Sequence, residues 1–252
     1  MSIEVRGIKI GEGIPKIIIP IVGKTKDEII AKAQEISLIN IDVVEWRVDF
    51  YEDVFNTEIL LETLKDLRSI LDNKIILFTF RTKNEGGEKE ISMEAYTELN
   101  KIVAQSGKVD LVDVEIFSGD EIVRENIENI HEAAVLVVGS NHDFFKTPDK
   151  DEIVSRLIKM QDMGADIPKI AVMPQTTEDV LTLLAATNEM YTKHANRPII
   201  TMSMGPLGVI SRLSGEIFGS SMTFGALGAV SAPGQIPVDE LTTTLEILHK
   251  SM

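Results

Sequence analysis

Short apolar runs alternate with amphipathic stretches of helical spacing along this sequence of 252 residues, and the alternation limits the folds open to it. The apolar runs predict buried strands at residues 16–22, 41–48, 74–80, 108–116, 134–140, 169–173, 198–204 and 221–225. The intervening stretches predict helices at 25–37, 57–71, 120–131, 150–163, 177–191, 208–218 and 238–248, with another that begins at Ser92. Strands that alternate with helices form parallel sheets through right-handed crossovers.

Eight such units in about 250 residues favour a closed (β/α)8 TIM barrel over an open doubly wound sheet. The prediction is therefore a single barrel domain that spans residues 1–252. An open Rossmann-like sheet would call for a Gly-x-Gly-x-x-Gly turn after its first strand, and Gly23-Lys24-Thr25 does not supply one. Residues Ile3 to Ile10 alternate and then meet a glycine-rich turn, which predicts a short N-terminal β-hairpin before the barrel.

The composition excludes several classes of function. A net charge of -15 argues against nucleic acid and anionic membranes as partners. The absence of cysteine excludes disulfides and thiol catalysis, and four dispersed histidines give no metal-binding pattern. No signal peptide is visible at the N-terminus, and the longest apolar run, Ile17 to Val22, is too short to span a bilayer. These features are compatible with a cytoplasmic protein and give little support for a bound metal.

Charged side chains interrupt the predicted strands with a period of two. They are Glu45, Arg47 and Asp49 in the second strand, and Asp113 and Glu115 in the fourth. This spacing puts each set on the lumen face of a barrel, near the end of the strand where catalytic groups lie. For Asp49, Asp113 and Glu115, a structural network of buried ion pairs is an equally good interpretation.

Lys169 and His142 are the candidate reactive groups. Lys169 begins an apolar strand, and burial makes a neutral, nucleophilic amine more available. The alternative is a lysine that buries its stem and keeps its head in water. His142 follows the preceding strand in a polar turn at the expected catalytic rim, where imidazole can exchange protons. A carboxylate such as Glu85 could orient this histidine.

Two later segments predict contacts to a substrate. Arg212 lies near the start of the helix after the seventh strand, where many barrels bind anions, although a surface arginine is the default interpretation. After the eighth strand, the loop at 226–237 combines small, proline and hydrogen-bonding residues, which is typical of a mobile lid. Ser231 and Gln235 are its candidate contact residues.

Together these segments resemble the type I 3-dehydroquinate dehydratase family along essentially the whole chain. The matching motifs are Glu45-Trp46-Arg47-Val48-Asp49, Phe78-Thr79-Phe80-Arg81, Glu85-Gly86-Gly87-Glu88, Ser140-Asn141-His142-Asp143-Phe144, Pro168-Lys169-Ile170-Ala171-Val172-Met173, Gly208-Val209-Ile210-Ser211-Arg212 and Ser231-Ala232-Pro233-Gly234-Gln235. The chain departs from the family at Pro20, where many members are expected to have a small polar residue that contacts the substrate.

The resemblance implies a cofactor-free hydro-lyase that converts 3-dehydroquinate to 3-dehydroshikimate, the third step of the shikimate pathway to chorismate and aromatic amino acids. Lys169 would form a Schiff base with the C3 ketone, His142 would be the general acid and base, and Glu85 would position it. The resemblance further implies substrate contacts from Glu45, Arg47, Arg81, Arg212, Ser231 and Gln235. It also implies a homodimer.

Two other functions stay open from the residues alone. An aldolase-type barrel also uses a lysine imine, but for phosphorylated sugars it would need a glycine-rich phosphate site, for which residues 205–208 and Gly225 are too sparse. A catalytically silent carboxylate-binding barrel would be expected to lose the lysine or the histidine. Both Lys169 and His142 are present.

Overall fold

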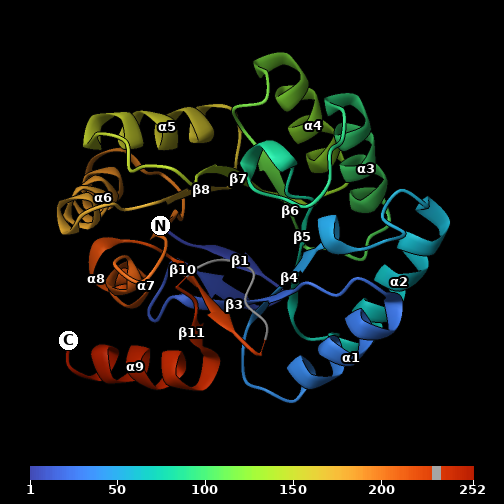
Figure 1. Ribbon diagram of the computed structural model, residues 1–252, viewed down its shortest axis with the longest axis horizontal. Coiled ribbons are helices and arrows are strands. Elements are labelled where there is room, and N and C mark those ends of the chain that lie inside the picture. The colour runs from blue at the N-terminus through green and yellow to red at the C-terminus, as the bar shows by residue number, and fades with distance from the viewer. Residues whose placement is uncertain (229–233) are drawn as a thin grey trace.

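The computed structural model describes residues 1–228 and 234–252, and eight parallel strands form its central ring (Figure 1). They are β3 (Lys16–Ile21), β4 (Val43–Arg47), β5 (Ile75–Thr79), β6 (Leu111–Glu115), β7 (Leu136–Asp143), β8 (Ile167–Val172), β9 (Ile200–Ser203) and β10 (Met222–Ala226). Strands β3 to β9 pair in sequence order, β10 pairs with β3, and a bridge between Ile199 and Ser220 closes the ring. The predicted (β/α)8 barrel is confirmed.

Helices surround this ring, and their colours follow the chain around it in Figure 1. They are α1 (Lys26–Ser37), α2 (Thr57–Ile70), α3 (Met93–Gln105), α4 (Asp120–Glu132), α5 (Lys150–Asp162), α6 (Thr177–Glu189), α7 (Val209–Leu213), α8 (Gly215–Phe218) and α9 (Val238–Lys250). The described residues also form the short helical turns η1 (Val48–Phe50), η2 (Lys83–Glu85) and η3 (Met190–His194), and strand β11 (Ile236–Pro237). Thr25 caps α1 in a reciprocal box with Glu28.

Two apolar layers hold the barrel together, one between strands and helices and one inside the ring. The N-terminal hairpin, β1 (Ile3–Val5) paired with β2 (Ile8–Ile10), is antiparallel, as predicted. Its Val5 and Ile10 pack in the inner layer with Ile18 and Ile75. The hairpin therefore covers the N-terminal end of the barrel, and the opposite end is where the site lies.

The lumen face of the strands changes from apolar to charged toward their C-terminal ends. Along β4 the buried lumen residues run from Val43 to Glu45 and Arg47, and along β8 from Ile167 to Lys169. The sequence spacing of two therefore separates a hydrophobic floor from an ionisable mouth within single strands.

Strand β7 is longer than its sequence predicts. The prediction ended this strand at Ser140 and placed His142 in a turn, which is wrong. The ladder with β8 continues from Ser140, opposite Lys169, to His142, opposite Ala171, and on to Asp143. Because β-pairing extends past the apolar run, His142 is fixed by backbone hydrogen bonds rather than carried on a loop.

The single helix predicted at 208–218 is also wrong, because the segment forms two short helices, α7 and α8. Ser214 separates them with φ -97° and ψ 14°, and its hydroxyl donates to the carbonyl of Ile210 at 2.8 Å. Gly215 approaches the Ser220 carbonyl so closely that a Cβ would lie 2.6 Å from the oxygen. The chain therefore turns at this point.

Candidate active site

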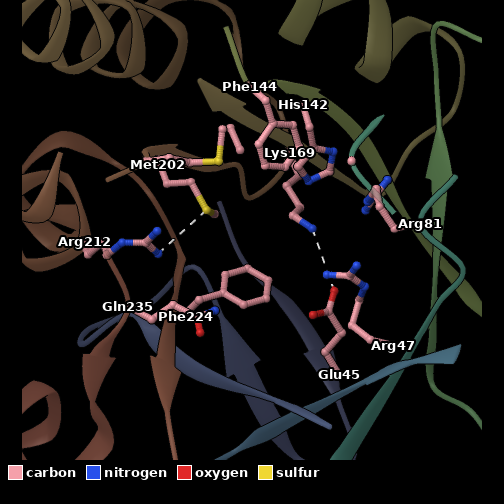
Figure 2. A pocket seen from close by; sticks show the side chains of 13 residues that line it. Glu45, Arg47, Arg81, His142, Phe144, Lys169, Met202, Arg212, Phe224 and Gln235 are labelled. Carbon is pink, nitrogen blue, oxygen red and sulfur yellow. Dashed lines mark hydrogen bonds and ion pairs between the residues drawn. The ribbon is translucent and has the colours of Figure 1, made fainter. Parts of the chain in front are cut away.

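Lys169 projects from β8 into the charged mouth of the barrel (Figure 2). Only 3% of the residue is exposed, so the interpretation of a water-reaching head group is wrong. Its Nζ lies 3.3 Å from Oδ2 of Asp113, 4.0 Å from Oε1 of Glu45 and 5.0 Å from the ring centroid of Phe224. The sequence predicted Glu45 and Asp113 on the lumen face, but it did not predict that, among the described residues, their carboxylates would lie within ion-pair distance of Nζ.

His142 and Glu85 form a close pair beside Lys169. Nδ1 of His142 lies 2.9 Å from Oε2 of Glu85, and the backbone N–H of His142 donates to the same oxygen at 3.0 Å. The amide of Asn141 donates to the other carboxylate oxygen at 3.1 Å. His142 and Lys169 both line one cavity. Because Nδ1 of His142 faces Glu85, the other ring nitrogen, Nε2, is the one available to a molecule bound in this cavity.

The surroundings of this pair disfavour charge on either member. Burial, and then the charge of Glu115, raise the pKa of Glu85 to about 8, against the opposing effect of Arg81 and Asn141. Burial and the positive charges of Arg81 and Lys169 hold the pKa of His142 well below its usual value. Both shifts favour the neutral forms of the pair, a protonated Glu85 carboxyl beside a neutral His142 imidazole.

The Glu85→Gln variant is expected to change how stability depends on pH. Because the folded pKa of Glu85 lies above its unfolded value, the folded protein binds more protons between pH 4.5 and about 8. This group therefore lowers the free energy of unfolding as pH rises through that range, by at most ~1.4 kcal/mol per pH unit. Glutamine does not titrate, so the free energy of unfolding of the variant should rise relative to that of the wild type as the pH approaches 8. Urea unfolding across the range tests this, and parallel profiles would contradict it.

Gly86 holds the turn that carries Glu85 against Phe144. Gly86 ends η2 with φ +85°, and a Cβ on it would lie 2.5 Å from Cε2 of Phe144. Phe144 in turn stacks on His142, with ring centroids 6.3 Å apart and planes 20° apart. The position therefore needs glycine both for its backbone and for the space that the aromatic ring fills.

Gly86→Ala is expected to lower both stability and activity. A side chain in this left-handed backbone conformation costs about 1–3 kcal/mol of stability. The new methyl group would also collide with Phe144 and so displace the His142–Glu85 pair, because Phe144 stacks on His142. Gly107→Ala is the matched control, since Gly107 has φ +64° and no described atom lies within 4 Å of its Cβ position. Denaturant unfolding and kcat measure the difference. Equal effects of the two substitutions would refute a packing role for Gly86.

Arg47 and Asp49 form a structural pair, which settles one of the open alternatives. Asp49 was predicted to continue the lumen face of the strand, but it lies in η1, where it accepts Nε and Nη2 of Arg47 at 2.8 Å each. The same carboxylate accepts the backbone N–H groups of Arg81 and Glu88. Asp49 therefore ties the ends of two strands and a loop, while Arg47 itself lines the cavity.

Arg81 is held by two carboxylates of β6. Its Nη1 donates to Glu115 and its Nη2 to Asp113, both at 2.8 Å. Thr82 adds backbone and hydroxyl hydrogen bonds to Glu115, at 2.8 and 2.6 Å. Ser140 also hydrogen-bonds with Arg81 and Asp113. Neither Thr82 nor Ser140 was predicted to belong to this network, because a neutral hydroxyl carries no charge signal.

Arg212 lies on the other side of the same cavity, away from Glu45 and Lys169 in Figure 2. It is 1% exposed, so the default interpretation of a surface arginine is wrong. Burial lowers the pKa of Arg212 to about 10, which still leaves a cation at neutral pH. Its Nη1 lies 4.0 Å from the sulfur of Met202. A guanidinium in such surroundings suits a substrate carboxylate.

The remaining sequence-predicted contacts have different outcomes. Gln235 lines the cavity with Arg212, whereas Ser231 lies outside the described residues. Met202, Met204 and Phe224 also line the cavity, and they were not predicted because apolar residues in strands indicate core. Pro20 lines a separate groove, together with Lys32 and Leu227 among other residues.

Within residues 1–228 and 234–252, no three or more His, Asp or Glu side chains are grouped so that they could hold a metal ion. In that part of the chain, no helix has the length and apolar character needed to cross a membrane.

Known proteins are similar to this chain in both sequence and fold. A family model described as type I 3-dehydroquinase matches residues 17–252. The 3-dehydroquinate dehydratases of Clostridioides difficile (strain 630) and Bacillus subtilis (strain 168) are 57% and 54% identical, and each alignment covers at least 99% of this chain and 98% of the relative. The crystal structure of the type I 3-dehydroquinate dehydratase from Clostridium difficile matches with a TM-score of 0.98 at 56% identity, covering 100% of this chain and 99% of that one. This chain therefore belongs to the type I 3-dehydroquinase family.

Proposed function

We propose that this protein removes water from 3-dehydroquinate through an imine on Lys169 and so catalyses the third step of the shikimate pathway to chorismate and aromatic amino acids. The observation that carries this proposal is that Lys169, His142 and Arg212 line one cavity. Relatives named 3-dehydroquinate dehydratase over nearly the full chain support the choice of substrate.

Imine formation begins with attack of the Lys169 amine on the C3 carbonyl carbon, which gives a carbinolamine. The His142–Glu85 pair then gives its proton to the carbinolamine hydroxyl, water leaves, and a protonated imine (an iminium) results. The pair is thereby left without its extra proton, in the form that can act as a base. The Clostridium difficile relative was crystallised with covalently modified comenic acid, which is compatible with a reactive nucleophile in that protein.

In the elimination, the same pair acts first as a base and then as an acid. The iminium withdraws electrons from the adjacent C2–H bond, His142 accepts the C2 proton, and an enamine forms. His142 then returns this proton to the C1 hydroxyl, which leaves as water while the enamine electrons form the C1–C2 double bond. A second water adds to C3, the pair takes its proton, and hydrolysis releases 3-dehydroshikimate and the free amine. Because the iminium is the electron sink, the reaction needs no metal or organic cofactor.

Binding of the substrate is assigned to both sides of the cavity. Arg212 would hold the carboxylate, and Glu45, Arg47 and Arg81 would contact the hydroxyl groups. The carboxylates that fix Arg47 and Arg81 would keep these guanidinium groups in place before the substrate arrives. Ser231 and Gln235 are proposed as contacts from the loop at 226–237.

Borohydride trapping tests the proposed function. Reduction of the protein during turnover of 3-dehydroquinate should fix a substrate- or product-derived adduct on the peptide that contains Lys169, as read by mass mapping. An adduct at Lys169 supports the imine mechanism. A folded protein that consumes the substrate without any adduct would overturn it, and an adduct without dehydration would indicate another imine-forming activity.

We further propose that the protein works in the cytoplasm as a homodimer. This assembly is what resemblance to the family implies, and the cysteine-free sequence is compatible with a reducing compartment. Light scattering of the purified protein measures its mass directly, and a monomer at working concentration would contradict the dimer.

A further inference from the structure

Asp113 lies beside Lys169 but has no role in the proton transfers of the proposed reaction. It lies on the lumen face of β6, is fully buried, and directs its two carboxylate oxygens in different directions. Oδ1 accepts Nη2 of Arg81 at 2.8 Å and the hydroxyl of Ser140 at 2.6 Å, whereas Oδ2 lies 3.3 Å from Nζ of Lys169. We propose that Asp113 is a positioning residue and counter-ion, which aims the Lys169 amine and balances the charge of the iminium formed on it.

The hydrogen bonds on Oδ1 explain why Oδ2 faces the lysine. Ser140 lies directly opposite Lys169 in the ladder between β7 and β8, so its hydroxyl and the lysine side chain start from neighbouring backbone positions. Arg81 and Ser140 hold one oxygen of Asp113, which fixes the carboxylate plane. The other oxygen then meets the amine in a set position rather than by free rotation.

Glu115, two residues further along β6, shows the contrast. It contacts Arg81 as Asp113 does, but its two oxygens accept from Arg81 and Thr82. Glu115 therefore compensates Arg81 and anchors the chain at Thr82. The two carboxylates share a face and a cationic partner, yet the contact with Lys169 is made by Asp113.

Asp113 carries the negative charge that this role needs. Burial acts to raise the pKa of Asp113, but the charges of Arg81 and Lys169 and the Ser140 hydroxyl outweigh it and keep the pKa below its usual range. The other ionisable groups that line the cavity with Lys169 are Glu45, at 4.0 Å from the amine, Arg47, Arg81, Arg212 and His142. Glu85 and Glu115 lie against Arg81. Asp113 is the nearer of the two carboxylates to Nζ.

This inference rests on the proposed imine at Lys169. Condensation of the amine with the C3 ketone forms the C=N bond and releases the carbonyl oxygen as water. The iminium nitrogen keeps one hydrogen and a positive charge next to Oδ2 of Asp113. A fixed carboxylate therefore stabilises both the iminium and the transition states that lead to it, without taking part in proton transfer.

Asp113→Asn and Glu115→Gln are the matched pair for a test. Each substitution keeps the side-chain shape and neutralises one buried carboxylate that pairs with Arg81. Of these two carboxylates, only that of Asp113 also lies beside Lys169, so Asp113→Asn removes that contact between charges as well. We expect Asp113→Asn to lower kcat about 100-fold with KM within a few fold. The rate of borohydride-trapped adduct formation should also shift its acidic limb to lower pH, because the amine has lost its negative neighbour. Glu115→Gln should leave that limb in place.

The outcomes separate this inference from the proposed function. Wild-type adduct together with an Asp113→Asn profile that matches Glu115→Gln would overturn the counter-ion role alone, whereas absence of adduct in the wild type would overturn the imine mechanism. If Asp113→Asn does not fold, Ser140→Ala carries the test, because it removes one donor that fixes Oδ1. A kcat reduced about tenfold at unchanged KM supports positioning, and an unchanged kcat refutes it.

Discussion

Lys169→Ala should abolish turnover of 3-dehydroquinate, with a loss of at least about 10⁴-fold in kcat, while the protein stays folded. The proposed reaction has no electron sink without the imine, so the C2 proton would have to leave a simple ketone. The fold should survive because Asp113 keeps Arg81 and Ser140 as partners when the lysine is removed. Steady-state kinetics and circular dichroism of the purified variant measure the two parts.

Two further lysine variants show whether the loss comes from the nucleophile. Lys169→Arg keeps a cation beside Asp113 but cannot form the imine, so it should be as inactive as the alanine variant. Lys74 is also buried, but its Nζ donates to the carbonyls of Ile39 and Ile41 at the opposite end of β5. Lys74→Ala should therefore lower stability and leave kcat per folded molecule unchanged. Near-native turnover by either Lys169 variant would end the imine mechanism.

The barrel is readable from the sequence because local patterns repeat eight times. Apolar runs, helical spacings and charges with a period of two on β4 each depend on residues close together in the sequence. The lumen face of β4 follows from that period alone, which is why Glu45 and Arg47 line the cavity as their spacing predicts. The side chains that a single strand presents to the site can be predicted in this way.

Contacts between strands were not predictable, because they depend on register and on loop conformation. Nothing local to Lys169 indicates that Asp113, far earlier in the chain, faces its amine. The fit of Gly86 against Phe144 depends on how a turn after β5 meets the end of β7. Asp49 left its predicted face because the strand ends at Arg47, where a helical turn starts. A charge pattern gives the face of a strand, whereas pairing decides the partner.

His142→Ala should lower kcat by about 10³-fold or more, the upper part of the range for removal of a general acid or base. The ring takes part in four proton transfers of the proposed cycle, so condensation, elimination and hydrolysis should all be slowed. The substitution should leave Lys169 able to form some imine, because an external proton donor can replace the histidine in that step slowly. Elimination should suffer more than condensation, because removal of a proton from carbon needs a well-placed base.

The mass of the trapped adduct makes this expectation sharper than a rate alone. If elimination is blocked, borohydride should fix the reduced substrate on Lys169, which is one water heavier than the reduced product. His131→Ala is the control, because His131 pairs with Asp166 at 2.8 Å on the outside of the barrel and should leave both rate and adduct unchanged. A His142→Ala enzyme that keeps kcat within tenfold, or that traps the product form, would assign the C2 proton to another base. Glu45 would then be the next candidate, because it lines the cavity and its carboxylate lies 4.0 Å from the lysine amine.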